Sequence, residues 1–422
     1  MATFLMDQTA SRALNDGGKG VRRLGRAALL ATDFPPALGG ISNFLFEVYR
    51  QFDLREMTLI APQHRDAERF DAGQDYRAER FRASIDVPGV RGAWQVWRMY
   101  REAEKLAKQN RDLVLHCGHV NTAVAARKLK RRYGTPYLLW TYALEIMDEW
   151  LRASILPAML DADLVITISE FTRAFLVSAG VAESRIVKIR PGADPERFRP
   201  GLDCRELAQR FGVLGRPTLL TVSRIVKANR YKGHDVVLRA LARVVRAVPE
   251  VAYVIAGDGD DLNYLDRLAR ECGVRENVTF VGHVSDEELP LLYNACDAFV
   301  MCSREERGRR GILAEGFGMA LVEASACGKP VIAGRSGGVP DAVQDGVTGL
   351  LVDPEDNEAV AAAIITVLRE PALATSMGAK GREWVEAEMN WSRAGDEFEQ
   401  AMDKFFPRVV CDGVFSERKE AV

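Results

Sequence analysis

The sequence predicts an α/β protein with two doubly wound domains, each a parallel sheet with helices on both faces. Short apolar stretches typical of buried strands alternate with segments of helical periodicity through the first half of the chain. The second half repeats this alternation. With 422 residues, the chain is long enough for two large domains with separate cores. We expect a ligand in a cleft between the two domains, where the carboxyl ends of their strands face each other.

The first domain is expected to cover residues 26–199, after a polar tail over residues 1–25. Its strands are predicted at 27–32, 57–61, 113–117, 137–140, 164–168 and 186–189. Gly39 and Gly40 lie between the first strand and a segment of helical spacing. Such a turn can bring the backbone close to a phosphate, although a glycine pair is also common in turns that bind nothing.

The second domain is expected to cover residues 200–390. Its strands are predicted at 218–222, 251–256, 278–281, 298–301, 330–333 and 349–352, with helices at 234–248, 262–272 and 286–295. No short-period repeat and no low-complexity stretch interrupts this pattern.

Composition is that of an ordinary globular protein, and no apolar run approaches the roughly 20 residues needed to span a bilayer. The seven cysteines are scattered and form no C-x-x-C, so we expect small core residues in a reducing compartment. The five histidines lack zinc-ligand spacing. We therefore expect a cytoplasmic protein without a bound metal or other cofactor, and we expect no nucleic-acid partner.

Charge is unevenly distributed. Residues 1–199 carry 30 lysines and arginines against 24 acidic residues, whereas residues 200–422 carry 27 against 35. The basic half suits an anionic partner such as a lipid surface, and a solvated surface is the alternative. Within it, residues 77–109 interleave arginines and lysines with aromatic side chains. This segment is either a basic amphipathic element that rests on a membrane or, as we favour slightly, an ordinary helix with its tryptophans in the core.

Two carboxylates mark the most informative stretch. Glu315 follows the buried strand at 298–301 on a loop, and Glu323 lies eight positions later on the helix that begins near Leu321. Free N–H groups at a helix start suit a phosphate, and the glycines of Gly316-Phe317-Gly318 allow a close approach. Flanking carboxylates can then hold sugar and ribose hydroxyls. An N-cap followed by a surface glutamate is the simpler interpretation of the spacing alone.

Two cations are expected at the same edge of the sheet. Arg224 follows the strand at 218–222, and Lys232 precedes the next helix. Arginine offers a bidentate contact and lysine a point charge to a diphosphate. Gly257, after the strand at 251–256, adds a further tight turn. Together these residues predict a nucleotide-sugar site.

These residues resemble the retaining glycosyltransferases of family 4, which have the GT-B fold. The resemblance covers roughly residues 26–400 and rests on the motifs of the second half. Ser223-Arg224 with Arg230 to Asp235 is similar to the family's diphosphate clamp, and Glu315 to Glu323 is similar to its Glu-x7-Glu signature. Pro35 to Gly40 resembles its Gly-Gly donor loop. The pattern is nearest to members acting on phosphatidylinositol mannosides or surface polysaccharide lipids.

The resemblance implies a role for each matching residue. Arg224 and Lys232 would neutralise the leaving nucleoside diphosphate, and Gly39 and Gly40 would approach its phosphate from the other domain. Glu323 would hold the ribose. Glu315 would hold hydroxyls of the transferred sugar, close to the anomeric carbon. It also implies retention by front-face displacement without a metal, and a final helix within 391–422 that crosses back to the first domain.

One segment departs from the family pattern. After the strand at 137–140 the family usually has a Thr-His-Gly-like segment, and Tyr142 stands here where its histidine would be. A tyrosine can contact a sugar hydroxyl but does not reproduce imidazole chemistry. His119 is a second candidate contact for sugar or acceptor, with a structural role at a helix start as the alternative.

The leading hypothesis is therefore a retaining transferase that moves a hexose from GDP-mannose or a UDP-sugar to a hydroxyl of a lipid-linked, saccharide or small-molecule acceptor, with peripheral membrane contact as a further expectation. A catalytically silent nucleotide-sugar-binding protein is one alternative, supported only by Tyr142. A nucleotide-sugar epimerase is another, although five histidines leave little room for its acid–base chemistry. A dinucleotide dehydrogenase is disfavoured because no strand precedes a proper G-x-G-x-x-G.

Overall fold

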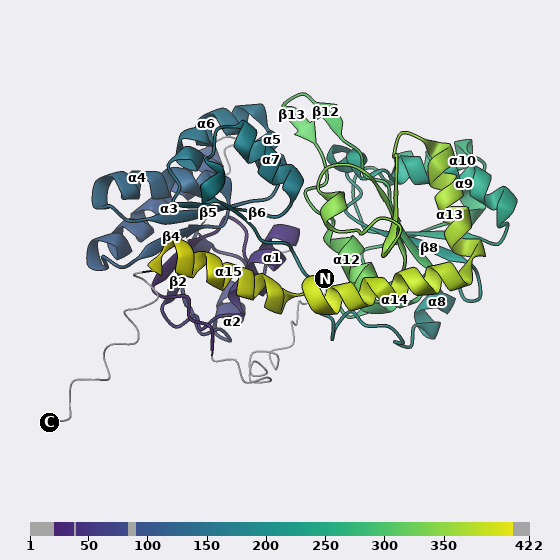
Figure 1. Ribbon diagram of the computed structural model, residues 1–422, viewed down its shortest axis with the longest axis horizontal. Coiled ribbons are helices and arrows are strands. Elements are labelled where there is room, and N and C mark those ends of the chain that lie inside the picture. The colour runs from purple at the N-terminus through teal and green to yellow at the C-terminus, as the bar shows by residue number, and fades with distance from the viewer. Residues whose placement is uncertain (1–20, 38, 83–89, 408–422) are drawn as a thin grey trace. The chain divides into compact units, whose positions relative to one another are not determined.

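A computed structural model describes residues 21–37, 39–82 and 90–407. The chain forms two compact units (Figure 1). The first contains the described residues up to Ile168, then Arg173–Ile189 and the chain from Trp391 on. The second contains Ser169–Thr172 and Arg190–Asn390. Most of the tail expected over residues 1–25 lies outside the described residues, as do Cys411 and the chain after residue 407.

The first unit is built on a seven-stranded sheet of order β3-β2-β1-β4-β5-β6-β7, in which every neighbouring pair is parallel. Strands β1, β4, β5 and β6 are buried along their whole length, as expected for a parallel sheet covered on both faces. The strands are β1 (Ala27–Leu30), β2 (Met57–Pro62), β3 (Arg77–Phe81), β4 (Val114–Cys117), β5 (Tyr137–Thr141), β6 (Leu164–Thr167) and β7 (Ile186–Lys188).

Helices connect these strands, as parallel pairing requires. They are α1 (Gly40–Tyr49), α2 (Ala67–Asp71), α3 (Val90–Gln109), α4 (Ala123–Tyr133), α5 (Leu144–Met147), α6 (Glu149–Leu160) and α7 (Glu170–Ser178), with short 3₁₀ turns at Val120–Thr122 and Glu183–Arg185. The last helix of the chain, α15 (Trp391–Phe405), also belongs to the first unit. Its fully buried Phe398 packs edge-on against Tyr49 and Phe52.

The second unit repeats this architecture with a six-stranded parallel sheet of order β10-β9-β8-β11-β14-β15. Its strands are β8 (Thr218–Val222), β9 (Ala252–Ala256), β10 (Val278–Gly282), β11 (Ala298–Met301), β14 (Val331–Gly334) and β15 (Gly349–Val352). Its helices are α8 (Arg205–Arg210), α9 (His234–Ala247), α10 (Leu262–Glu271), α11 (Glu288–Asn294), α12 (Met319–Ala326), α13 (Asn357–Arg369) and α14 (Pro371–Glu388), with 3₁₀ turns at Lys227–Lys232, Arg275–Asn277 and Val339–Asp341.

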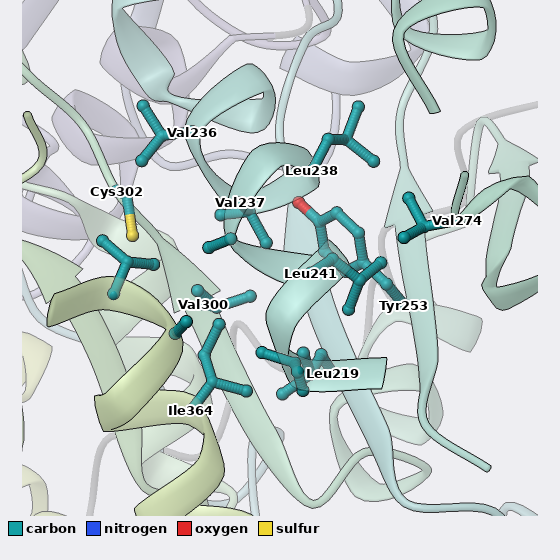
Figure 2. Close-up of a cluster of buried hydrophobic side chains, with 14 of the residues drawn as sticks. Leu219, Val236, Val237, Leu238, Leu241, Tyr253, Val274, Val300, Cys302 and Ile364 are labelled. Carbon is teal, nitrogen blue, oxygen red and sulfur yellow. The ribbon is translucent and has the colours of Figure 1, made fainter. Parts of the chain in front are cut away.

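The core of the second unit forms where α9 and α13 pack on the sheet (Figure 2). Leu238 and Leu241 of α9 are fully buried, together with Val300 of β11 and Ile364 of α13. The apolar face of α9 repeats at helical spacing, so burying it against the sheet stabilises this helix, which begins at His234, two residues after Lys232.

The predicted doubly wound α/β fold is confirmed in both units. Two features were not predicted: the edge strand β3, and an antiparallel hairpin of β12 (Glu306–Gly308) and β13 (Gly311–Leu313). The expected boundary at residue 200 differs from the division of the chain into units, because the second unit takes in Ser169–Thr172 and Arg190–Asn390.

The interpretation of residues 77–109 as one helix with its tryptophans in the core was wrong. The segment contains β3 and α3, and residues 83–89 lie outside the described structure. On α3, Trp97 is 45% exposed and stacks on the half-buried Trp94 with 4.8 Å between ring centroids. The guanidinium of Arg101 lies 5.8 Å from the Trp97 ring centroid. The tryptophans therefore lie at the surface, beside basic side chains.

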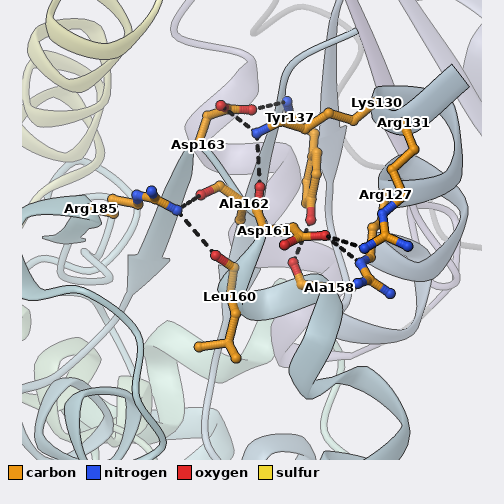
Figure 3. A network of polar contacts seen from close by, with 10 residues as sticks. All are labelled: Arg127, Lys130, Arg131, Tyr137, Ala158, Leu160, Asp161, Ala162, Asp163 and Arg185. Atoms are coloured by element: carbon orange, nitrogen blue, oxygen red, sulfur yellow. Dashed lines mark hydrogen bonds and ion pairs between the residues drawn. The ribbon is translucent and has the colours of Figure 1, made fainter. Parts of the chain in front are cut away.

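Much of the basic run at the end of α4 is neutralised within the first unit (Figure 3). Arg127 and Arg131 pair with Asp161, and Lys130 lies 2.6 Å from the carboxylate of Asp163. Lys130 also donates to the carbonyl of Asp161. These lysine and arginine side chains tie α4 to the segment between α6 and β6, so they contribute less to an anionic surface than the sequence suggests.

Among the described residues, no single helix has both the length and the apolar composition of a membrane span. Helices α13 and α14, which meet at 96°, pass that test only as a bent pair and only by length and composition.

Candidate functional site

The candidate site of the second unit lies where its strand order reverses. β9 and β10 extend the sheet on one side of β8, and β11, β14 and β15 extend it on the other. Loops that leave β8 and β11 in opposite directions open a crevice at the carboxyl ends of these strands, where doubly wound folds bind ligands. Arg224 and Lys232 lie in the segment after β8, and Glu315 lies in the segment after β11.

Lys232 and Glu315 are brought together by these two segments. The Lys232 ammonium donates to Oε2 of Glu315 at 2.6 Å, and both side chains are only 15–17% exposed. Burial alone would lower the pKa of Lys232, but the Glu315 carboxylate outweighs it, so this pKa is raised. Lys232 is therefore a charged, positioned donor at neutral pH, as a ligand for a diphosphate must be.

Glycine is required at two places that hold the loops together. Gly233 adopts a φ of 77°, and a Cβ there would lie 1.9 Å from the carbonyl oxygen of Cys302. Gly257 adopts a φ of 135°, and a Cβ there would lie 1.8 Å from the carbonyl oxygen of Ser223. Gly257, predicted to bind donor, thus also has a packing reason to be glycine.

Arg224 is exposed and lines a small pocket at this edge of the sheet. Arg224 and Lys232 place two like charges at this edge of the sheet. The charge of Arg224 therefore acts to lower the pKa of Lys232. The pocket is lined by Arg224, Ile225, Val226, Asn229, Arg230, His234, Asp235, Asp261, Tyr264 and Leu265.

Two neighbouring groups serve the loop rather than a ligand. Arg230 makes two hydrogen bonds to Asp261, at 2.7 and 2.6 Å, and stacks on the Tyr264 ring. His234 lies 2.9 Å from the hydroxyl of Ser223, and burial lowers its pKa to about 4. His234 is therefore neutral at pH 7, and the positive charge of this edge comes from Arg224 and Lys232.

The segment between the two glutamates divides into packing and loop positions. Gly318 begins α12 with a φ of 102°, a backbone conformation that favours glycine. Phe317 is 2% exposed, so its side chain packs in the core and only its backbone is available to a ligand. Gly316 and Glu315 remain half-buried on the loop.

Glu323 has a partner that sequence reasoning missed. The Tyr293 hydroxyl of α11 donates to Oε2 of Glu323 at 2.7 Å. Burial raises the pKa of Glu323 to about 7, although this hydrogen bond works against the rise. Tyr293 is fully buried, with its ring 5.8 Å from that of Phe198 and 5.7 Å from that of Phe299, so it holds one carboxylate oxygen in place. No local signal marks Tyr293, because the contact joins two helices 30 positions apart.

In the first unit, Gly39 and Gly40 begin helix α1. Gly39 is its N-cap, and its carbonyl accepts from the backbone N–H of Asn43. A Cβ at Gly39 or Gly40 would meet nothing within 4 Å. Local packing therefore does not require these two glycines, and the open space beside them is compatible with the close approach of a ligand.

Tyr142 and His119 lie together, after β5 and β4. Their ring centroids are 6.1 Å apart. Tyr142 is 6% exposed, and its hydroxyl donates to the carbonyl of Gly118 at 3.0 Å. His119 Nδ1 accepts from the backbone N–H of Thr32, and its Nε2 lies 3.8 Å from the Asp33 carboxylate. Burial lowers the pKa of His119, so an uncharged imidazole stands beside the tyrosine.

Comparisons with known proteins agree with this geometry. Residues 206–384 match the family model described as glycosyl transferases group 1, and residues 38–197 match that of glycosyltransferase family 4. Both units thus match glycosyltransferase domains, and the chain is an enzyme of this class that uses a nucleotide-sugar donor.

Similar proteins narrow the class. A GDP-mannose-dependent alpha-(1-6)-phosphatidylinositol monomannoside mannosyltransferase of Mycobacterium tuberculosis is 36% identical over 378 residues, which is 87% of this chain and 95% of that protein. The protein of the same name from Mycolicibacterium smegmatis is 33% identical with the same coverage. The chain belongs to the family 4 glycosyltransferases.

Solved structures share the fold. HepE of Anabaena, crystallised with UDP and glucose, matches with a TM-score of 0.74 and 19% identity, over 90% of this chain and 99% of that one. A sucrose-phosphate synthase from Thermosynechococcus elongatus matches with a TM-score of 0.73 and 24% identity over the same shares. The predicted GT-B fold is therefore confirmed.

Proposed function

We propose that this protein is a retaining mannosyltransferase that transfers mannose from GDP-mannose to a hydroxyl of a phosphatidylinositol mannoside. The observation that carries the choice of donor and acceptor is the similarity to the two mycobacterial mannosyltransferases, which extends over 95% of their length. The charged pair Lys232–Glu315 at the switch point supports the same reaction class.

The reaction breaks the bond between the anomeric carbon and the diphosphate of the donor. The acceptor hydroxyl forms the new bond on the same face of the sugar, and its proton passes to the departing diphosphate. Arg224 and Lys232 stabilise the negative charge that develops on the leaving group. Glu315 holds hydroxyls of the transferred mannose, and Glu323 holds the ribose.

Lys232 exchanges partners when the donor binds. Its ammonium is paired with Glu315 at 2.6 Å, and an arriving diphosphate competes for the same protons. Glu315 is then free to accept from the sugar. The two partners of the ion pair thus become ligands of the donor, Lys232 for the phosphate and Glu315 for the sugar, without a large movement of either loop.

The protein needs no divalent cation for this step, because Arg224 and Lys232 supply the positive charge that a metal provides in other transferases. Transfer is expected to proceed at an unchanged rate in excess EDTA. A loss of activity that Mg²⁺ or Mn²⁺ restores would contradict this.

Peripheral membrane contact is a further part of the proposal. Trp97 is exposed on α3 beside Arg101, and amphipathic aromatic side chains next to basic ones favour the interface of an anionic membrane. Trp97→Ala is expected to weaken sedimentation with anionic vesicles. If Trp97→Ala bound anionic vesicles as tightly as the wild type, this face of α3 would not be the membrane contact.

Binding and transfer measurements test the function as a whole. Thermal unfolding is followed with GDP, UDP, ADP and the matching sugar nucleotides. A ligand at about 100 times its dissociation constant adds roughly 2.7 kcal/mol, which is several degrees for a domain of this size. GDP-mannose should stabilise the protein and donate mannose to phosphatidylinositol monomannoside, with an α linkage visible by NMR.

Other outcomes identify the alternatives. Donor binding without hydrolysis or transfer indicates a silent nucleotide-sugar-binding protein, and a changed sugar configuration on the free nucleotide indicates an epimerase. A β linkage would contradict retention.

A further inference from the structure

The hairpin of β12 and β13 is a feature that the proposed reaction does not use. Its strands pair only with each other, with Arg307 opposite Ile312, and belong to neither large sheet. It extends away from the six-stranded sheet of its own unit (Figure 1). It is inserted directly before Glu315, within the segment that follows β11.

The base of the hairpin is fixed to the candidate site. Arg304 pairs with Asp235 at 2.8 Å and with Glu306 at 2.5 Å, and its backbone N–H donates to the carbonyl of Tyr231, next to Lys232. Glu305 accepts from the backbone N–H of Gly337. The hairpin is therefore held in a defined direction by the loops around Lys232 and Glu315.

The far end of the hairpin is cationic. Arg307, Arg309 and Arg310 are all exposed. Within the described part of the chain, Arg307 and Arg309 make no side-chain hydrogen bond or ion pair, whereas both glutamates of the hairpin are engaged at its base. The unpaired guanidinium groups of Arg307 and Arg309 lie in a half of the chain in which acidic residues outnumber basic ones by 35 to 27.

We propose that this cationic hairpin binds the phosphodiester of a lipid-linked acceptor. The inference rests on the proposed function, since it names how that acceptor is recognised. Guanidinium groups form paired, charge-assisted hydrogen bonds with phosphate oxygens. Arg310 lies five residues before Glu315, so at about 3.3 Å per extended residue the end of the hairpin is within about 17 Å of it along the backbone.

A general anionic membrane surface is the competing ligand, because it carries the same phosphate chemistry. The anchoring favours the acceptor: Arg304 and Glu305 tie the hairpin to the loops that carry Lys232 and Glu315, which membrane attachment alone does not require. Recognition of the acceptor phosphate, in contrast, needs a fixed distance between the cations and the sugar-transfer position.

The test is a steady-state comparison of wild type with the double variant Arg307→Ala/Arg309→Ala. The acceptors are a deacylated, water-soluble phosphatidylinositol monomannoside and a neutral mannoside that lacks phosphate. The variant should raise KM for the phosphorylated acceptor about tenfold or more, while KM for the neutral acceptor and the dissociation constant for GDP-mannose stay within about twofold. Arg307→Lys/Arg309→Lys should recover part of the loss.

A matched control removes two exposed arginines elsewhere in the same unit. Arg246 on α9 and Arg267 on α10 have no ion pair within the described residues, so Arg246→Ala/Arg267→Ala changes net charge equally. This control should leave KM for both acceptors unchanged. If the control variant also raised KM for the phosphorylated acceptor, net charge rather than the hairpin would determine acceptor affinity.

An unchanged KM for the soluble phosphorylated acceptor in the hairpin variant would overturn the proposal. If that variant also lost sedimentation with acceptor-free anionic vesicles, the hairpin would be assigned to the membrane. A wild-type protein that transfers to neither acceptor would refute the proposed function itself, and the hairpin proposal with it.

Discussion

The two units share a topology but differ in the chemistry at their switch points. In the first unit the strand order reverses between β1 and β4, and in the second between β8 and β11. The second unit places a charged pair, Lys232 and Glu315, at that position. The first has His119 after β4 and Tyr142 after the neighbouring β5; a tyrosine hydroxyl is neutral at pH 7, and burial lowers the pKa of His119, so its imidazole is uncharged as well. The same fold thus places a charged pair at the edge of one sheet and neutral hydrogen-bonding groups at the edge of the other.

The largest effect is expected when the positive charge of Lys232 is removed from the switch point of the second unit. Lys232→Ala deletes the proposed leaving-group ligand and leaves the Glu315 carboxylate without its partner. We expect kcat/KM for transfer to fall roughly 10²–10³-fold, the range found for lost electrostatic stabilisation of a transition state. The exposed Lys227 on the same loop provides the control, and Lys227→Ala should change kcat/KM less than threefold. A similar loss in both variants would contradict a specific role for Lys232.

The next largest effect is expected when the hydrogen bond between Tyr293 and Glu323 is removed. Tyr293→Phe removes a hydrogen bond to a buried carboxyl, so donor affinity should fall about tenfold. The pKa of Glu323, about 7 in the intact protein, should rise further because the hydroxyl no longer stabilises the carboxylate. Donor affinity should weaken as pH falls from 8 to 6, with a midpoint at higher pH in the variant.

Calorimetric titration with GDP across this pH range measures both effects. Tyr253→Phe is the control, because Tyr253 is an equally buried tyrosine whose hydroxyl contacts Thr221 in the core of the same unit. A pH midpoint that is identical in wild type and Tyr293→Phe would show that the tyrosine does not position Glu323.

Stability should fall on acidification because both units bury neutral histidines. Burial lowers the pKa of His116 in the first unit to about 3 and that of His234 in the second to about 4. Each folded-state pKa lies below the unfolded value near 6.5, so the unfolded chain binds more protons as pH falls below 6.5. Each histidine then costs about 2 kcal/mol of stability at pH 5. The raised pKa of Glu323 acts in the opposite direction and offsets part of this.

Thermal unfolding between pH 7.5 and 5 checks this effect. The Tm should fall steadily below pH 6.5. His116→Gln should make this fall smaller. His64→Gln, at an exposed position, should leave the pH dependence of Tm unchanged. A Tm that is constant down to pH 5 would contradict the buried neutral state.

The smallest effect is expected at Tyr142. Its hydroxyl donates to Gly118, so Tyr142→Phe should cost about 1 kcal/mol of stability and change the affinity for GDP-mannose less than twofold. Chemical denaturation and calorimetry measure the two quantities. A large loss of donor affinity with unchanged stability would instead make Tyr142 a direct ligand contact.

The sequence predicted that Lys232 and Glu315 lie close together, because that proximity depends on local rules. Parallel strands end at one edge of a sheet, so residues after β8 and β11 had to approach each other, and Lys232 and Glu315 do. Tyr293 could not be predicted in the same way. It is one apolar-face residue of α11, and only the packing of α11 on α12 gives its hydroxyl a carboxylate to contact.

The errors have physical reasons as well. Residues 306–313 alternate charge and glycine without an apolar face, so nothing in their pattern predicts strands, and the hairpin forms because its base is anchored by Arg304 and Glu305. Trp97 was placed in the core because tryptophan is usually buried, whereas it stacks on Trp94 at the surface.

The most direct test of the central claim is calorimetric binding of GDP to wild type and to the Arg224→Ala, Lys232→Ala and double variants. If the cations of the second unit hold the diphosphate, each single variant should weaken binding about tenfold or more, and the double variant should bind GDP no better than guanosine. If the double variant bound GDP as tightly as the wild type, the diphosphate would lie elsewhere and the account of this site would be wrong.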